Sequence, residues 1–172
     1  TNVTTVRSFL PQKIFSPIWN NFIFPRYLKK EKIDLLFSVN QILPLFKVKG
    51  CKYISVVNDV IYKADPHFLP FTYRKYLQFF AYFSIKISDL ILTISEYSKK
   101  DILKHYKVDE DKVRVVLQSA NKEFKPMNLT EAEKSEIKAH LKLTKYTILY
   151  VGVIENRKNI FGILEVAEKF VE

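Results

Sequence analysis

The chain has 172 residues, of which 48% are apolar and 27% charged, so it can bury a hydrophobic core and is not a disordered chain. A single cysteine, Cys51, excludes an internal disulfide, and three glycines are too few for a glycine-rich phosphate loop. The net charge is +10, and residues 1–50 hold eight basic but only two acidic side chains. Strongly basic chains bind nucleic acid, anionic membranes or phosphorylated ligands.

The first two thirds of the sequence alternate between helical and extended patterns. A helix is expected over residues 16–30 with a break at Pro25, because proline removes a backbone donor. Further helices are expected over 72–88, where apolar residues recur every three or four positions, and over 96–106, where Ser95 is an N-cap. The expected strands are 33–39, 52–58, 90–94 and 113–117. This alternation predicts an α/β fold with a mainly parallel sheet.

The pattern changes after residue 117. Residues 118–128 are polar and end in Lys-Pro, which is typical of a linker. Thr130 and Glu133 have the spacing of a capping box, so a charged helix should follow. A fifth strand is expected over 146–151 and a last helix over 159–171.

In parallel sheets, ligands bind beyond the carboxyl ends of the strands, which directs attention to the loops after Val57, Ile94 and Val151. The last of these loops contains Gly152 and then Arg157 and Lys158 at the start of a helix. Helix N-termini favour anions, arginine grips phosphate oxygens and lysine adds a point charge. An anion site and an ordinary solvated Arg-Lys pair are equally compatible with this pattern.

The other two loops carry weaker signals. Asp59 could hold a hydroxyl or orient a base, although turn formation is the commoner role of Asp. Ser95 and Glu96 suit an N-cap and the first turn of a helix, and they could also line the same cleft. The histidines are scattered singly, with no metal-ligand spacing, so no metal site is expected.

Aromatic and basic residues are interleaved in segments 22–30 and 68–75. Core aromatics with solvated charges are the simpler interpretation. A surface that lies on an anionic membrane is the sharper one. Single-stranded nucleic-acid binding uses the same residue types, but the chain has no RNA-binding signature, so no nucleic-acid partner is expected.

Five segments, in order, resemble the retaining nucleotide-sugar glycosyltransferases of the GT-B fold, in glycosyltransferase family 4. The segment at 88–102 reads S-D-L-I-L-T-I-S-E-Y-S-K-K-D-I and is close to the family pattern A-D-x-I-x-T-V-S-x-x-S-x-x-D-I. The other four are I-D-L-L-F-S at 33–38, V-V-N-D-V at 56–60, F-K-P at 124–126, and I-L-Y-V-G at 148–152 with R-K-N at 157–159.

The resemblance implies transfer of a sugar, with retention, from a nucleotide-sugar donor to a polysaccharide or lipid-linked acceptor in cell-envelope glycan synthesis. It assigns the donor diphosphate to Arg157 and Lys158 and places Gly152 in the same loop. It places Asn58 and Asp59 at the reaction centre as the catalytic pair. The remaining cleft-lining candidates are Ser95, Glu96 and Asn159. No cofactor or bound metal is expected.

The resemblance also implies a partial GT-B architecture of Rossmann-like parallel sheets. Residues 1–120 would be the later part of the N-terminal acceptor-side domain, 121–130 a linker and 131–172 the start of the C-terminal donor domain. The chain would then be an internal fragment, inactive in isolation, of a cytoplasmic enzyme that is peripheral on the inner face of the cell membrane.

Two departures from the family pattern keep a second interpretation open. The family's catalytic-loop histidine is Asn58 here, and asparagine cannot carry a proton. The usual N-G-V-D turn is Q-S-A-N at 118–121. A non-catalytic, truncated homologue that acts as a binding module is the alternative.

Overall fold

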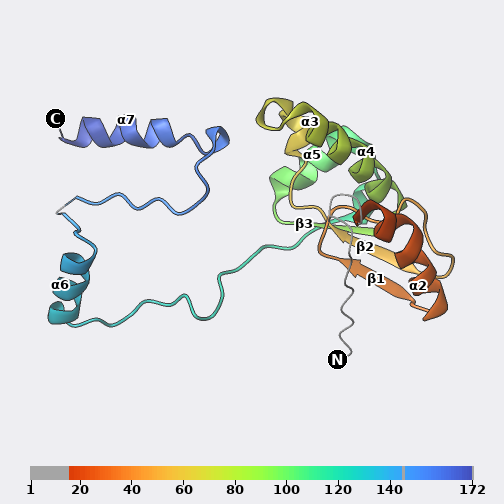
Figure 1. The fold of residues 1–172 in the computed structure, drawn as a ribbon, viewed down its shortest axis with the longest axis horizontal. Coiled ribbons are helices and arrows are strands. Elements are labelled where there is room, and N and C mark those ends of the chain that lie inside the picture. The colour runs from red at the N-terminus through yellow and green to blue at the C-terminus, as the bar shows by residue number, and fades with distance from the viewer. Residues whose placement is uncertain (1–15, 145, 172) are drawn as a thin grey trace. The chain divides into compact units, whose positions relative to one another are not determined.

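The structure is a computed structural model that describes residues 16–144 and 146–171. Contacts divide the chain into two compact units, Thr1–Gln118 and Ser119–Glu172 (Figure 1). The first unit contains a parallel sheet with its helices, whereas the second contains helices and extended segments. The two units therefore differ in how much of their apolar surface they can bury.

The first helical segment reaches Lys30 without the break expected at Pro25. A π-helical turn, Trp19–Ile23, leads into α2, Phe24–Lys30, and Pro25 lies in the first turn of α2. The Phe24 N–H donates to the Trp19 carbonyl, and the Arg26 side chain donates to the Phe22 carbonyl at 2.5 Å. The prediction of a break is wrong. The wider π-helical turn and the Arg26 side chain provide hydrogen bonds to backbone groups next to the proline, so the helical conformation continues.

Four parallel strands form the sheet, in the order β1-β2-β3-β4 (Figure 1). Each strand lies within a segment that the sequence predicts to be extended and is shorter than that prediction. The predicted parallel, Rossmann-like α/β fold is confirmed. The strands are β1 (Leu35–Ser38), β2 (Lys52–Val56), β3 (Leu90–Thr93) and β4 (Val113–Val115).

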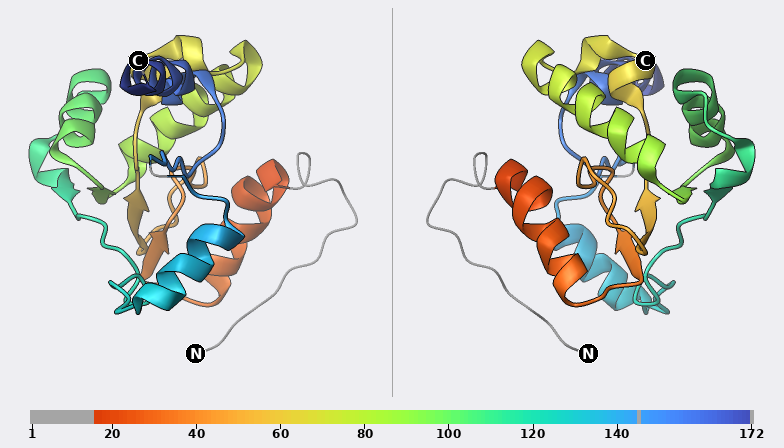
Figure 2. Two further views of the ribbon diagram at one scale, coloured as in Figure 1. Left: turned by 90° about the vertical axis from the view of Figure 1, so that its left-hand side faces the viewer. Right: turned by 90° about the vertical axis from the view of Figure 1, so that its right-hand side faces the viewer.

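Helices α4 (Phe71–Ile87) and α5 (Glu96–Tyr106) connect consecutive strands. Right-handed crossovers between strands that follow one another in sequence place these helices on one side of the sheet. The turned views of Figure 2 show α2 in red-orange and α4 in yellow-green beside the strands. The strand residues buried beneath the helices lie in matching register: Leu36, Tyr53, Ser55, Ile91 and Val113.

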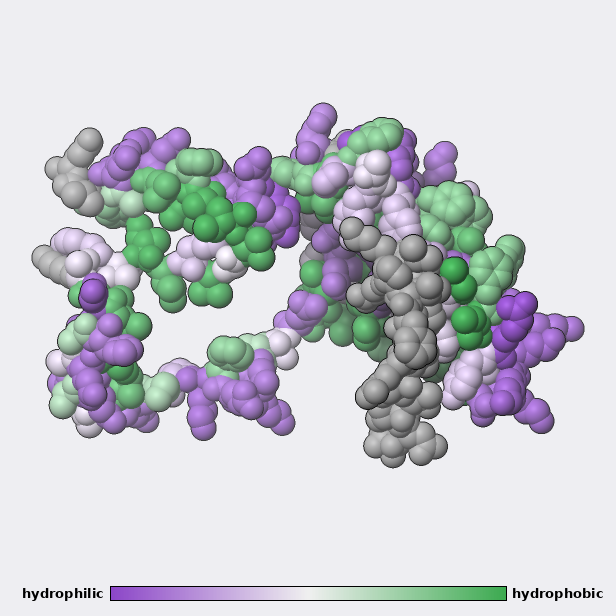
Figure 3. Space-filling view, in the orientation of Figure 1, coloured by the Kyte–Doolittle hydropathy of each residue, from purple (hydrophilic) through white to green (hydrophobic). Residues whose placement is uncertain are grey.

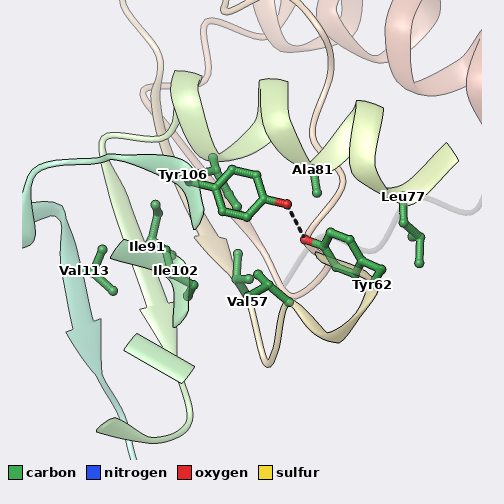
Figure 4. Packing of buried hydrophobic residues seen from close by; sticks show 10 residues of the cluster. Val57, Tyr62, Leu77, Ala81, Ile91, Ile102, Tyr106 and Val113 are labelled. Atoms are coloured by element: carbon green, nitrogen blue, oxygen red, sulfur yellow. Dashed lines mark hydrogen bonds between the residues drawn. The ribbon is translucent and has the colours of Figure 1, made fainter. Parts of the chain in front are cut away.

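Two apolar clusters fill the space between helices and sheet. One joins Leu28 of α2 to Leu36 and Tyr53 of the strands. The larger one joins α4 and α5 to the sheet and to the short helix α3, Ile61–Ala64. Within it, the Tyr106 hydroxyl donates to the Tyr62 hydroxyl at 3.2 Å (Figure 4). Burial raises the pKa of both tyrosines, so the pair stays neutral in the core.

The other face of the sheet carries apolar side chains that no described residue covers fully. Leu35 and Phe37 of β1 are 51% and 53% exposed, and Val116, just after β4, is 53% exposed. Strands of parallel sheets are normally buried on both faces. Only one face of this sheet is therefore fully packed within residues 16–118.

The second unit contains α6, Glu131–His140, and α7, Ile160–Val171. The predicted capping box is confirmed, because the Thr130 hydroxyl accepts from the Glu133 N–H and the Glu133 carboxylate accepts from the Thr130 N–H. The strand predicted over 146–151 does not form. A strand needs a partner for its backbone groups, and the described part of this unit offers none. Leu149 and Val151 are consequently exposed, as are Phe161, Leu164, Val166 and Phe170 of α7. Green, hydrophobic surface is visible where α7 lies in Figure 3.

The tyrosine pair and an unpaired threonine give opposite stability predictions. Tyr106→Phe removes the donor to Tyr62 and should lower the free energy of unfolding by about 1 kcal/mol.

Thr93 is fully buried, and its hydroxyl has no hydrogen-bond partner among the described residues. Thr93→Val should therefore leave stability unchanged or raise it by about 1 kcal/mol. Denaturant unfolding measures both, and equal losses in the two variants would contradict this account of the core.

The carboxylate of Asp89 predicts a pH-dependent contribution to stability. Burial raises the pKa of Asp89, but hydrogen bonds from Lys47 Nζ at 2.6 Å and the Tyr53 N–H at 2.7 Å, with Lys52 nearby, hold it below its usual value. Asp89→Asn should cost about 1 kcal/mol at neutral pH. That difference should shrink as the pH falls below about 4, where the unfolded chain takes up the proton, and vanish only once the pH is below the lowered pKa of Asp89 in the folded state. A difference that persists in acid would exclude the carboxylate as its source.

Candidate functional site

A pocket of about 400 Å³ opens at the carboxyl ends of β1 and β2. Two loops form it, one after each strand. The lining residues are Val39, Asn40, Gln41, Val56, Asn58 and Asp59. The pocket thus lies at the edge of the sheet where ligands bind in parallel α/β folds.

The loop after β2 is held in place by its apolar neighbours. Val57 and Val60 are buried in the larger core cluster, and this leaves Asn58 and Asp59 exposed between them. The Asp59 carboxylate accepts the Ile61 N–H at 3.2 Å, at the start of α3. The turn role that the sequence left open for Asp59 is therefore present, and its carboxylate also reaches the pocket lining.

The loop after β1 supplies the residues that the sequence analysis missed. The Ser38 hydroxyl donates to the Asn40 carbonyl at 3.0 Å, and the Asn40 side chain accepts the Ile42 N–H at 3.3 Å. Leu43 follows as a buried anchor. The signal was available, because Asn40 and Gln41 directly follow the strand predicted over 33–39, as Asp59 follows the strand predicted over 52–58.

The chemistry of the pocket suits hydroxyl groups better than phosphate. Gln41 and Asn58 contribute amide groups, and their side chains make no hydrogen bond with any other residue in the described part of the chain. The one charged lining residue is Asp59, which is an acceptor when ionised. Amides that donate and accept, next to a carboxylate, match the hydroxyls of a sugar, whereas a carboxylate disfavours a phosphate.

Ser95 and Glu96 do not join this pocket. The Ser95 hydroxyl accepts the Ser98 N–H at 3.1 Å and caps α5, while Glu96 lies in the exposed first turn. Neither lines the cavity beyond β1 and β2. The capping role of Ser95 is observed, and the cleft role of both residues stays a prediction.

In the loop before α7, the two predicted cations lie in a short turn and not in the first turn of the helix itself. Arg157 and Lys158 lie in a 3₁₀ turn, Asn156–Lys158, and both are exposed. Arg157 Nη2 pairs with Glu155 Oε1 at 2.7 Å, which offsets one of the two positive charges. Lys158 forms no ion pair with the other described residues, so it is the freer of the two cations.

Two further residues shape this loop. Gly152 has φ +155°, a value that residues with a side chain rarely adopt. Asn159 has φ +48°, and its side-chain oxygen accepts the Gly162 N–H at 3.3 Å. Asn159 thus occupies part of the N-terminus of α7 that was expected to face an anion.

The described residues offer neither a metal site nor a membrane-spanning helix. Residues 16–144 and 146–171 contain no cluster of three or more His, Cys, Asp or Glu side chains with the geometry of a metal site. In the same ranges, every helix is too short or too polar to cross a bilayer.

Comparison with known proteins identifies the family. The family described as Glycosyltransferase Family 4 matches residues 1–119, which include the whole described part of the first unit. The chain belongs to glycosyltransferase family 4. The family resemblance inferred from the sequence motifs is therefore confirmed, and the pocket beyond β1 and β2 lies inside the matched region.

Two individual proteins are similar to this family 4 chain. The O-antigen chain mannosyltransferase B of Escherichia coli is 25% identical over 112 residues, which are 65% of this chain and 29% of that protein. A glycosyltransferase crystal structure from Rickettsia africae is 18% identical with a TM-score of 0.45, over 83% of this chain and 36% of that one. The chain thus spans about a third of the length of each protein.

A pair of substitutions at Asp59 separates its turn role from its charge. Asp59→Ala removes the acceptor of the Ile61 N–H and should lower the free energy of unfolding by about 0.5–1 kcal/mol. Asp59→Asn keeps an acceptor oxygen at the same position and should leave stability unchanged. Thermal unfolding of both variants measures this, and equal destabilisation would show that the turn depends on the charge itself.

Proposed function

We propose that the protein containing this chain is a glycosyltransferase. It transfers a sugar, with retention of configuration, from a nucleotide-sugar donor to a polysaccharide or lipid-linked acceptor. The observation that carries the proposal is the family 4 match, which spans a sheet whose carboxyl edge holds an amide-rich and carboxylate-bearing pocket. The chain spans 29% of the length of the E. coli relative, and in this proposal it would be one portion of such an enzyme.

The pocket beyond β1 and β2 supplies the acceptor side in this proposal. Asp59 would accept a hydrogen bond from the reacting hydroxyl, and Asn58 would position the sugar through its amide. Asn58 cannot act as the proton carrier that a histidine could be. The catalytic step would therefore depend on hydrogen bonding and on electrostatic stabilisation of the leaving group.

The donor side is assigned to the loop before α7. Arg157 and Lys158 would bind the diphosphate and meet the negative charge that develops as the sugar leaves. Gly152 would allow close approach of the ligand to the backbone. The Glu155–Arg157 ion pair implies that the arginine exchanges its partner when a diphosphate binds.

The E. coli relative suggests a more specific substrate. That protein is named as a mannosyltransferase of the O-antigen chain. By analogy, we propose a hexosyl donor and an acceptor in cell-envelope glycan synthesis, including lipopolysaccharide. The proposed enzyme is cytoplasmic, peripheral on the inner face of the membrane, and needs neither a metal nor another cofactor.

Asn58 supports a second candidate, a non-catalytic homologue that retains only binding. Such a protein would hold a sugar in the pocket without transferring it. Glycan binding without turnover of any nucleotide sugar by the intact protein would favour this alternative, whereas transfer with retention would exclude it.

The donor assignment is tested by replacing both cations. Arg157→Ala with Lys158→Ala in the intact protein should weaken nucleotide-sugar binding by about 100-fold or more, because two charge-assisted contacts are lost. Isothermal titration calorimetry measures the affinity. Glu155→Gln is the matched control: it releases Arg157 from its ion pair and should leave affinity equal or higher. Unchanged donor affinity in the double variant would refute the assignment.

A further inference from the structure

Helix α4 has an unusual composition for a surface helix. Seven of its 17 residues are aromatic, three are basic and none is acidic. Solvent-exposed helix faces normally carry charges of both signs. This composition raises the question of which medium the helix faces on its outer side.

The two faces of α4 are clearly separated. Leu77, Ala81, Ser84 and Ile85 are buried against the sheet. The opposite side is solvent-exposed and forms one stripe, because its members recur at helical spacing. We define the α4 outer face as Phe71, Lys75, Phe79, Tyr82, Phe83 and Lys86.

Large aromatic surfaces are exposed on this face. Phe71 is 64% exposed, Phe79 52% and Tyr82 48%. The rings pack against one another, with centroids 5.0 Å apart for Phe79 and Phe83 and 5.5 Å apart for Tyr82 and Phe83. Phe79, Tyr82 and Phe83 thus form a continuous aromatic patch.

The cations are placed among these rings. Arg74 and Lys75 lie 5.4 and 5.7 Å from the centroid of the Phe71 ring. At the other end of the helix, Lys86 donates to the Lys107 carbonyl, which adds a second lysine near that end. The outer face therefore presents aromatic rings between two positively charged ends.

Hydrogen bonds hold α4 on the sheet. The Ser84 hydroxyl accepts the buried Leu43 N–H at 2.8 Å, and the Ser88 hydroxyl, just after α4, pairs with that of Ser55 in β2 at 2.9 Å. The helix is therefore a fixed part of the fold, and its outer face is presented without a change in structure. A partner that binds the α4 outer face would therefore touch the protein from outside, without inserting between α4 and the sheet.

We propose that the α4 outer face docks on the surface of an anionic phospholipid bilayer. Aromatic rings favour the headgroup region, and lysines next to them are attracted to lipid phosphates. A face with three cations on its helix and no carboxylate complements that charge. The biological reason for this docking rests on the proposed transfer to a lipid-linked acceptor. The physical argument rests only on the residues of α4. From the sequence, a membrane-binding surface was expected at residues 22–30 and 68–75, whereas this proposal assigns it mainly to α4.

Vesicle flotation of the intact protein tests the inference. Binding should be strong to phosphatidylcholine vesicles that contain phosphatidylglycerol and weak to phosphatidylcholine alone. Phe79→Ser with Phe83→Ser should reduce binding about tenfold or more, because two rings no longer partition into the interface. Lys75→Gln with Lys86→Gln should reduce binding to the anionic vesicles at least tenfold and leave the weak binding to neutral vesicles unchanged.

Matched controls come from α5. Tyr97 is 75% exposed and Lys100 is exposed, and neither belongs to the α4 outer face. Tyr97→Ser and Lys100→Gln should leave vesicle binding unchanged. Circular dichroism checks that all variants are folded. Equal losses in the α4 and α5 variants, or no loss in the α4 variants, would overturn the proposal.

A fluorescent probe reports the contact directly. Trp19 is the only tryptophan in these 172 residues, so in a Trp19→Phe background Phe79→Trp adds the one tryptophan that this chain contributes to the emission. Lipids brominated in their acyl chains should quench Trp at position 79 and spare it in the control with Tyr97→Trp. Absent quenching at position 79, or equal quenching at both positions, would contradict bilayer contact. So would self-association through α4, seen by sedimentation as a dimer that these Phe79 and Phe83 changes dissociate.

Transfer to a short water-soluble acceptor keeps this test separate from the proposed function. The α4 variants should retain that transfer while they lose vesicle binding. Vesicle binding through α4 without any transfer would refute the enzyme and leave the membrane surface intact. Transfer without vesicle binding would refute the membrane surface and leave the proposed enzyme activity intact.

Discussion

The parallel pairing of four strands in sequential order is the constraint on which the described fold of residues 16–118 depends. Each crossover must be right-handed, so the connecting helices collect on one side of the sheet. That side becomes the core, with the two clusters around Tyr53 and around the Tyr62–Tyr106 pair. The same pairing brings the carboxyl ends of β1 and β2 together, so Asn40 and Asp59 line one pocket although they lie 19 positions apart.

The sheet also explains what remains exposed. Leu35 and Phe37 project from the face that no helix of residues 16–118 covers, and they are half exposed as a result. The second unit has a comparable excess of exposed apolar surface, because its expected strand has no partner to pair with.

Much of the first unit could be predicted from sequence because its signals are local. The run L-I-L-T identifies β3, Ser95 identifies the start of α5, and Thr130 with Glu133 identifies the start of α6. The segment at 146–151 failed for a physical reason: a β-branched, apolar run specifies a strand only when other strands complete its ladder. The Glu155–Arg157 ion pair was equally unpredictable, because a sequence does not tell which side chain turns toward which. Asn40 and Gln41 could have been found by applying the strand-end rule to every strand.

Asp59 is the residue at which fold, family and proposed chemistry meet, since it accepts the N–H of the first residue of α3, lines the pocket and lies inside the family 4 match. The most direct measurement is therefore sugar transfer by the intact protein and by its Asp59→Asn variant, from a radiolabelled nucleotide sugar to a lipid-linked acceptor. The account predicts transfer with retention by the unmodified protein and a loss of about 100-fold or more in a variant with the same melting temperature. Equal transfer by both proteins, or none by either, would contradict it.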